Sequence, residues 1–278
     1  MTDVSIIIIN YNTLNMTLEC IESVLLNTSE INFEIILVDN ASIDGSKEYF
    51  EKDSRIKYIY NEKNLGFGRA NNIGIDISSG RNILFLNSDT ILMNNAVKIM
   101  SDFLDATSSV GACGGNLYTL NGAPNVSFRR QLPSVYDSLN GVLLNVPNRL
   151  LFRRNQYFNY SMDPIDVGFV CGADMMVKRN VLDKVGYFNP LFFMYYEETE
   201  LSYRIKKHYK IMNIPQAKIV HLDGGSFDKN NISKEKQKRL SESKVLYFTL
   251  THSNFYYLIV CILDKLASYT QLLYNKLK

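Results

Sequence analysis

The order of apolar and polar segments in the first 115 residues constrains the fold of this chain more than any other feature. Short apolar runs of strand length, such as residues 4–10 and 82–86, alternate with segments whose apolar residues recur at helical spacing, such as residues 14–26. This alternation is typical of a parallel sheet with helices on both faces. We expect an α/β fold with a Rossmann-like, mostly parallel central sheet. The expected strands here are 4–10, 34–39, 56–60, 82–86 and 110–114, and the expected helices are 14–26, 45–52, 68–78 and 95–104.

Beyond residue 115 the alternation gives way to a different pattern. Residues 116–165 are rich in Asn, Arg and aromatic side chains and are expected to form loops with short helices. Strands are expected at 173–178, 210–214 and 218–221, and a helix at 198–208. A basic amphipathic helix is expected from about residue 233, followed by an aromatic-rich segment at 255–263.

Charge is distributed unevenly between the body and the tail. The net charge is only +2, which predicts no nucleic-acid partner, but residues 229–278 carry nine Lys/Arg and three Asp/Glu. Such a tail suits a negatively charged surface such as anionic lipid, and a solvated Lys-rich helix is the alternative. The longest apolar run, nine residues, is about half of the ~20 needed to cross a bilayer. The scattered cysteines and the absence of a signal-peptide pattern favour the cytosol.

Polar side chains follow three of the expected strands. Because parallel strands deliver their carboxyl ends to one edge of a sheet, where ligands bind in α/β folds, we expect these side chains to line a ligand site. One such strand end alone would be explained by turn preference. A carboxylate at such an edge can hold Mg²⁺ or Mn²⁺ against a diphosphate. The residues are Asn10 and Asn12, Asp39 and Asn40, and Asn87, Ser88 and Asp89.

The glycines of this half lie at the start of a helix rather than after the first strand. The first strand–helix connection has no glycine, which excludes a dinucleotide-binding fingerprint, and a P-loop lysine is also missing. Backbone N–H groups at a helix start can hold a phosphate or a sugar. The candidate residues are Asn64, Gly66, Arg69 and Asn71.

A second acidic cluster, Glu197 and Glu198, opens the expected helix at 198–208. Carboxylates favour the positive end of a helix, so a structural role is reasonable. The aromatic residues before them favour another interpretation, because an apolar neighbourhood raises a carboxylate's pKa and suits it to general-base work. His221 ends an apolar strand and is a candidate ligand or a structural histidine with about equal weight.

Eight short motifs occur in a fixed order along residues 4–226. They are SIIIINYN at 5–12, VDNAS at 38–42, NLGFGRANN at 64–72, NSD at 87–89, GAD at 172–174, VGYF at 185–188, FFMYYEE at 192–198 and His221. Together they resemble the inverting glycosyltransferases of family 2, and most closely a bacterial rhamnosyltransferase-like branch of polysaccharide and O-antigen assembly.

The resemblance implies a GT-A fold, a UDP- or dTDP-linked sugar donor and a divalent metal, Mn²⁺ or Mg²⁺. It implies that Asp39 contacts the pyrimidine base, with Asn10 and Asn12 near the nucleotide. Asp89 matches the last Asp of the family's Asp-x-Asp motif and His221 its second metal or diphosphate ligand. Glu198 matches the catalytic base. Two departures matter: Asn87 replaces the first Asp of the motif, and Glu198 stands where Asp is usual, which leaves Glu197 as an alternative base.

The resemblance also divides the chain. Residues 1–228 would form the catalytic domain, with a nucleotide-binding half (1–115) and an acceptor-side half (116–228). Residues 229–278 would form a tail that contacts the inner face of the cell membrane, packs on the domain, or joins a homodimer. Gly172, Asp174, Arg129 and Arg130 are candidates for binding the acceptor, a glycan or a polyprenyl-diphosphate-linked glycan. The alternative functions are a sugar nucleotidyltransferase and a nucleotide-binding protein without catalysis.

Overall fold

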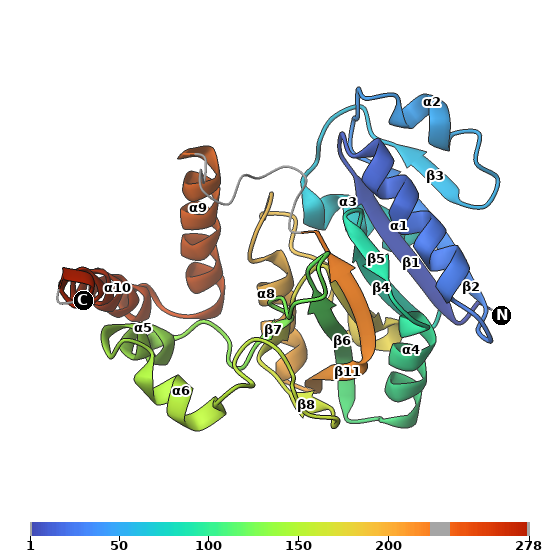
Figure 1. The fold of residues 1–278 in the computed structure, drawn as a ribbon. Helices are drawn as coiled ribbons and strands as arrows, with labels where there is room; N and C mark the ends of the chain where they lie inside the picture. The colour runs from blue at the N-terminus through green and yellow to red at the C-terminus, as the bar shows by residue number, and fades with distance from the viewer. Residues whose placement is uncertain (1, 223–233, 277–278) are drawn as a thin grey trace.

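A computed structural model describes residues 2–222 and 234–276 (Figure 1). The predicted boundary between residues 228 and 229 lies outside these ranges. The strands are β1 (Val4–Asn10), β2 (Phe33–Asp39), β3 (Lys57–Tyr60), β4 (Asn82–Asn87), β5 (Thr90–Leu92), β6 (Val110–Tyr118), β7 (Phe128–Arg129), β8 (Ile165–Asp166), β9 (Phe169–Val170), β10 (Asp174–Lys178) and β11 (Lys210–His221). The helices are α1 (Leu14–Asn27), α2 (Ser46–Phe50), α3 (Phe67–Ile77), α4 (Ala96–Ala106), α5 (Val135–Val142), α6 (Val146–Phe152), α7 (Arg179–Val185), α8 (Glu197–Lys206), α9 (Lys234–Thr251) and α10 (Asn254–Lys276).

A mixed central sheet organises the molecule, in the strand order β3-β2-β1-β4-β10-β6-β11-β5. Strands β3, β2, β1 and β4 are mutually parallel, and so are β6 and β11. This confirms the predicted mostly parallel sheet. The short strands β7 and β9 pair antiparallel in a separate two-stranded sheet.

The isoleucine-rich strand β1 shows why helices cover both faces of the sheet. Successive side chains of a strand point to opposite faces. Accordingly Ile6 and Ile8 pack with α1 and α4 on one face, whereas Ile7 packs with α3, α7 and α8 on the other. Both faces are therefore buried, which explains a strand with four consecutive isoleucines.

The structure differs from the sequence predictions in several details. Strand β10 runs antiparallel between β4 and β6, and the short strand β5, absent from the predictions, pairs antiparallel with β11. The two strands expected at 210–214 and 218–221 are one strand, β11, with an irregular register between Ile214 and Lys218. These pairings depend on partners distant in sequence, which local patterns do not reveal.

Of the tail helices, α10 packs against α5, and α9 packs against α8 and α10 (Figure 1). A third apolar cluster joins them, with Tyr247, Phe248 and Val260 of the tail around Phe192 of the body. The hydroxyl of Tyr203 in α8 donates a hydrogen bond to the carbonyl of Thr251 (3.0 Å). Of the three alternatives for the tail, packing on the domain is the one that the structure shows. Among the described residues, no helix combines the length and the apolar character needed to cross a membrane.

Candidate active site

The ends of β1 and β2 hold a buried polar network. Asn10 and Asp39 are paired in register. The Asn10 amide donates to a carboxylate oxygen of Asp39 (3.0 Å) and to the Ser42 hydroxyl (3.1 Å). The backbone N–H of Ser42 and the hydroxyl of Tyr58 also donate to Asp39, at 2.7 and 3.2 Å. Asp39 is fully buried, and these hydrogen bonds fix the orientation of its carboxylate at the sheet edge.

The loops after β1 and β4 lie beside this network. Asn12 adopts a left-handed backbone conformation, and its amide oxygen accepts from the N–H of Ile43 (2.8 Å). The hydroxyl of Ser88 is within hydrogen-bonding distance of the Thr13 hydroxyl (3.2 Å). Asn12 is exposed, whereas Ser88 is half-buried. The predicted convergence of three strand ends is therefore observed, and the role of these residues in binding a nucleotide stays a prediction.

Asn40 shapes the loop that begins α3. Its amide N–H₂ donates to the side-chain oxygen of Asn64 and to the carbonyl of Gly66, both at 3.2 Å. Gly66 has a positive φ of 83°, and a Cβ there would collide with the carbonyl oxygen of Phe193. That same carbonyl accepts a hydrogen bond from Phe67 N–H (2.9 Å). The loop predicted to hold a sugar or phosphate thus rests on the segment that leads to Glu197.

Two other predicted residues of α3 have structural partners. The Arg69 side chain is exposed, and its Nε donates to the carbonyl of Pro190 (2.7 Å). Asn71 is buried and donates to the carbonyl of Phe67 one turn earlier (3.0 Å). Both contacts brace the first turn of α3 and the adjoining loop.

Asp89 and His221 lie together, although 132 positions separate them in the chain. The imidazole Nε2 is 3.3 Å from a carboxylate oxygen of Asp89, and both side chains are largely buried. The cause is the pairing of β5 with β11, which places Thr90 opposite His221. Carboxylate and imidazole are both suitable ligands for Mn²⁺, and Mg²⁺ is commonly held by one or two carboxylates plus substrate phosphates. Within residues 2–222 and 234–276 no group of three or more His, Cys, Asp or Glu side chains is placed to hold a metal ion, and the role of Asp89 and His221 as metal ligands stays a prediction.

Glu197 and Glu198 begin α8, directly after Tyr195 and Tyr196, which both have positive φ angles. Burial raises the pKa of both carboxyl groups, and for Glu197 the nearby charge of Glu198 adds to the rise in pKa. The hydroxyl of Thr199 donates to Glu198 (2.9 Å). One carboxylate oxygen of Glu197 is buried with no hydrogen-bond partner among the described residues.

Of the predicted acceptor residues, Gly172 and Asp174 have different surroundings. A Cβ on Gly172 would lie 3.6 Å from the Glu198 side chain. Asp174 is fully buried in β10, accepts a hydrogen bond from Gly115 N–H (2.6 Å), and does not line the cavity beside Glu198. Burial raises the pKa of Asp174 to about 7.

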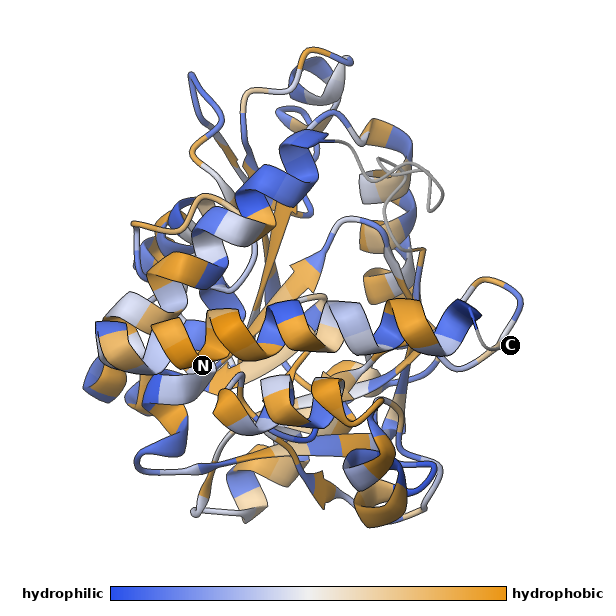
Figure 2. Ribbon diagram, turned by 90° about the vertical axis from the view of Figure 1, so that its left-hand side faces the viewer, coloured by the Kyte–Doolittle hydropathy of each residue, from blue (hydrophilic) through white to orange (hydrophobic). Residues whose placement is uncertain are grey.

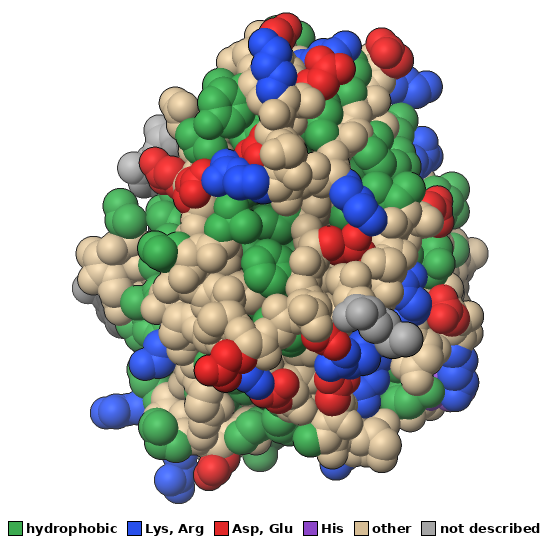
Figure 3. Space-filling view, turned by 90° about the vertical axis from the view of Figure 1, so that its right-hand side faces the viewer, with side chains coloured by type: hydrophobic (Ala, Val, Ile, Leu, Met, Phe, Trp, Pro, Cys, Tyr) green, Lys and Arg blue, Asp and Glu red, His purple; other side chains and the backbone are tan. Residues whose placement is uncertain are grey.

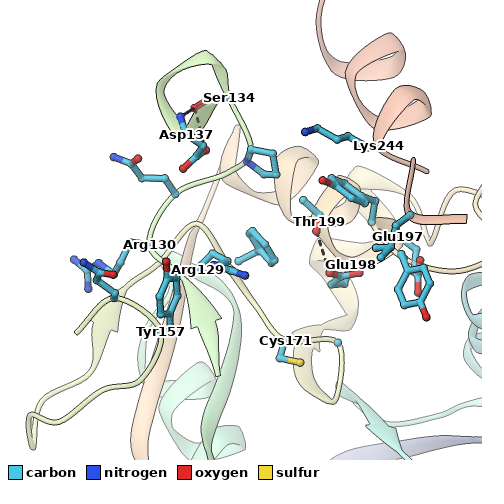
Figure 4. A pocket seen from close by; sticks show the side chains of 18 of the residues that line it. Arg129, Arg130, Ser134, Asp137, Tyr157, Cys171, Glu197, Glu198, Thr199 and Lys244 are labelled. Carbon is cyan, nitrogen blue, oxygen red and sulfur yellow. Dashed lines mark hydrogen bonds between the residues drawn. The ribbon is translucent and has the colours of Figure 1, made fainter. Parts of the chain in front are cut away.

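A cavity of about 620 Å³ connects the acidic pair with the acceptor-side half (Figure 4). Asn87, Gly172, Glu197 and Glu198 line one part of it. Arg129, Arg130 and Tyr157 line another. The tail also contributes side chains, which the sequence predictions missed because nothing local in the tail indicates where it folds back. These tail residues are Leu240, Lys244, Phe248 and Asp264.

Comparisons with solved structures agree with this architecture. The fold is similar to that of GalNAc-T7 crystallised with UDP, GalNAc and Mn²⁺, with a TM-score of 0.65 at 16% identity over 97% of this chain and 55% of that one. It is also similar to residues 1–349 of TarS from S. aureus, with a TM-score of 0.55 at 18% identity over 91% and 74% of the two chains. The chain has a GT-A-like fold, as predicted.

Sequence relatives are glycosyltransferases. A low-salt glycan biosynthesis hexosyltransferase, Agl10 of Haloferax volcanii, is 28% identical over 78% of this chain and 66% of its own length. An uncharacterized glycosyltransferase of Rickettsia bellii is 39% identical over 38% of this chain and 16% of its own length. The chain thus spans less than a fifth of that Rickettsia relative. The model of the glycosyl transferase family 2 domain matches residues 5–186, and the chain therefore belongs to glycosyl transferase family 2.

Proposed function

We propose that this protein is an inverting glycosyltransferase that moves a sugar from a nucleoside-diphosphate sugar to a hydroxyl group of a glycan. The observation that carries the proposal is the cavity that joins Asn87, at the end of β4, to the neighbouring carboxyl groups of Glu197 and Glu198. Family membership over residues 5–186 supports it. A UDP- or dTDP-linked donor, with rhamnose among the candidate sugars, follows from the motif resemblance.

In the proposed reaction Glu198 acts as the general base. Its carboxylate takes the proton of an acceptor hydroxyl while the hydroxyl oxygen attacks the anomeric carbon of the donor sugar. The bond from that carbon to the nucleoside diphosphate breaks on the opposite face, which inverts the configuration. Glu198 suits this role because it lines the cavity, is held by Thr199, and has a pKa raised by burial.

The donor diphosphate is proposed to lie at the sheet edge. Asn10, Asn12, Asp39 and Asn40 would surround the nucleotide, and Asp89 and His221 would hold a divalent metal. A metal there would neutralise charge on the leaving diphosphate. Asp89 carries the only charge of the Asn87-Ser88-Asp89 motif, so binding of the metal and the diphosphate should depend strongly on it.

A membrane surface is the proposed location of the reaction. The outer side of α10 carries an apolar stripe with helical spacing, defined here as the α10 face: Phe255, Leu258, Ile262, Leu266 and Tyr269. Val260 points the other way, into the body. Leu150 and Leu151 of α6 are also exposed, and exposed Arg149, Arg153 and Arg154 lie in or next to α6. Exposed apolar side chains accompanied by cations fit anionic lipid.

A thermal-shift screen of nucleotide sugars, with and without Mn²⁺ or Mg²⁺, tests the proposed donor site. Binding to the folded state raises the apparent melting temperature by mass action. We expect one UDP- or dTDP-sugar to raise the melting temperature, to do so more strongly with metal, and to lose that increment in Asp89→Asn. If no nucleotide sugar stabilises the wild-type protein, the proposed function is wrong.

A further inference from the structure

The tail helices form one wall of the cavity that holds Glu198, instead of standing apart from it. Lys244 of α9 forms an ion pair with Asp264 of α10, and Asp264 also accepts a hydrogen bond from the Ser138 hydroxyl of α5 (2.8 Å). The hydroxyl of Ser243 donates to the carbonyl of Met194, three residues before Glu197 (2.8 Å). These contacts join α9 and α10 to both sides of the cavity.

Two arginines on the opposite part of the cavity have donors that the protein itself leaves unused. The guanidinium of Arg129 lies 4.5 Å from the centre of the Tyr157 ring, and that of Arg130 lies 4.9 Å from the Phe152 ring. Among the described residues neither guanidinium has a hydrogen bond or an ion pair, and the Arg130 Nε is buried. Figure 4 shows both arginines on the side of the cavity away from Glu197.

An arginine stacked on an aromatic ring is held in place by cation–π attraction while its N–H donors stay free. Such a planar set of donors matches the oxygens of a phosphate, which it can bind with two parallel hydrogen bonds. Lys244 is a third cation in the cavity, and it donates one of its three possible hydrogen bonds to Asp264. Asp137 and Asp264 also line the cavity and moderate the positive charge.

We propose that this cavity binds an acceptor that carries a phosphate or diphosphate group, held by Arg129 and Arg130, with Lys244 adding positive charge from the tail wall and the reactive hydroxyl of the acceptor toward Glu198. The inference rests on the proposed glycosyltransferase function and deepens it. It assigns the tail a part in the acceptor site, whereas the sequence predicted a membrane contact, packing on the domain or a dimer contact for the tail. The phosphate belongs either to a lipid diphosphate carrier or to a free phosphorylated glycan.

Calorimetric titration of the full chain with a short-chain prenyl diphosphate, and separately with inorganic pyrophosphate, tests the inference. The double variant Arg129→Met, Arg130→Met should weaken binding at least tenfold, since it removes the charge-assisted hydrogen bonds to the phosphate. Arg154→Met, on an exposed arginine that does not line the cavity, is the matched control and should bind as the wild type does. Lys244→Met is compared in the same way with Lys238→Met, whose lysine is exposed on α9.

The outcomes separate the possible sources of the phosphate. Binding of the prenyl diphosphate alone assigns a lipid carrier, and comparable binding of pyrophosphate assigns phosphate recognition without the lipid. If the wild type binds neither ligand, or if the double variant binds both unchanged, the inference is overturned. If the double variant fails to fold, Arg129→Lys is measured in its place. This variant keeps the charge but loses the planar pair of donors, and it should also weaken ligand binding at least tenfold. Nucleotide-sugar binding is measured in parallel, because a wild-type protein that binds no nucleotide sugar would count against the proposed function itself.

Discussion

Glu197 and Glu198 are neighbours in sequence whose surroundings differ. The Glu198 carboxylate has a hydroxyl partner in Thr199, is half-buried, and faces Gly172, where the lack of a side chain leaves room. Glu197 is almost completely buried, and one of its oxygens has no partner within the described residues. The resemblance to family 2 left open which residue is the base, and these surroundings favour Glu198.

The raised pKa of this pair has a consequence for the pH dependence of the reaction. A general base works in its ionised form, so the turnover rate should rise with pH as the pair loses its proton. Burial raises the Glu198 pKa above its ordinary value of 4.5. We therefore expect the acid limb of the kcat profile above pH 4.5, with apparent pKa values that belong to the pair. A limb at or below pH 4.5 would contradict the buried environment described for Glu198.

The contribution of this pair to stability should decrease as pH rises, whereas the turnover rate should increase. Because folding raises the pKa of both carboxyl groups, protonation favours the folded state. Their contribution is fully present below their ordinary value of 4.5 and is lost as pH rises through the raised values. The measurement is the free energy of unfolding of wild type and Glu197→Gln across this range, and the variant should lose less stability as pH increases.

At the residue scale, the polar residues that follow the strands in sequence predicted most of the side chains found at the sheet edge. Asn10 and Asp39 hydrogen-bond each other, as expected for ends of adjacent parallel strands. The proximity of Asp89 and His221 followed from the family resemblance and not from spacing, because it depends on the unpredicted strand β5. Asp174 was predicted at the acceptor site on motif order alone, and only the pairing of β10 shows that its side chain is enclosed in the sheet.

At the scale of elements, the connection between the α3 loop and the segment before α8 holds the two halves of the site together. Phe67 N–H and Asn40 fix the loop, and Gly66 lets it approach Phe193 closely. Helix periodicity predicted α3 and α8 to within a few residues. It did not predict the hydrogen bond from Phe67 N–H to the Phe193 carbonyl, which joins backbone groups 126 positions apart.

Gly66→Ala should disturb this connection. The added Cβ would collide with the Phe193 carbonyl, and the positive φ of residue 66 disfavours any side chain. We expect a loss of stability of at least about 1–3 kcal/mol and a lower kcat. Gly122→Ala is the control, since Gly122 has a similar positive φ but no atom within 4 Å of the added Cβ. Equal melting temperatures and equal activity for the two variants would show that the contact with Phe193 is unimportant.

At the scale of the whole molecule, the two sides of the protein differ. The side that carries α1 and β2 has acidic and basic side chains interspersed over its surface (Figure 3). The opposite side, formed by α10 with α5 and α6, shows hydrophobic residues along the outer helix (Figure 2). The sequence composition predicted the basic tail. It could not predict the apolar surface that α10 shares with α6, because that surface forms only through the packing of α10 against α5.

The α10 face should therefore bind anionic vesicles. Leu258→Ser with Ile262→Ser removes two exposed apolar side chains, each worth up to about 1.5–3 kcal/mol when buried in lipid. Flotation with phosphatidylglycerol vesicles should fall more than tenfold. Leu26→Ser in α1, a leucine that is 84% exposed on another side, should float as the wild type does. If the wild-type protein does not bind the vesicles, the proposal is contradicted. If the wild type is a dimer and the double variant is a monomer, the α10 face contacts a second copy of the chain instead.

The most direct test of the central claim is the turnover number for release of nucleoside diphosphate from the preferred donor in the presence of acceptor. We expect Glu198→Gln to lower kcat by about 10²–10⁴-fold, the usual contribution of a general base, with donor affinity unchanged. Glu197→Gln should keep most of the activity. Near-normal turnover in a folded Glu198→Gln protein would contradict the assignment of this cavity as the place where the sugar is transferred.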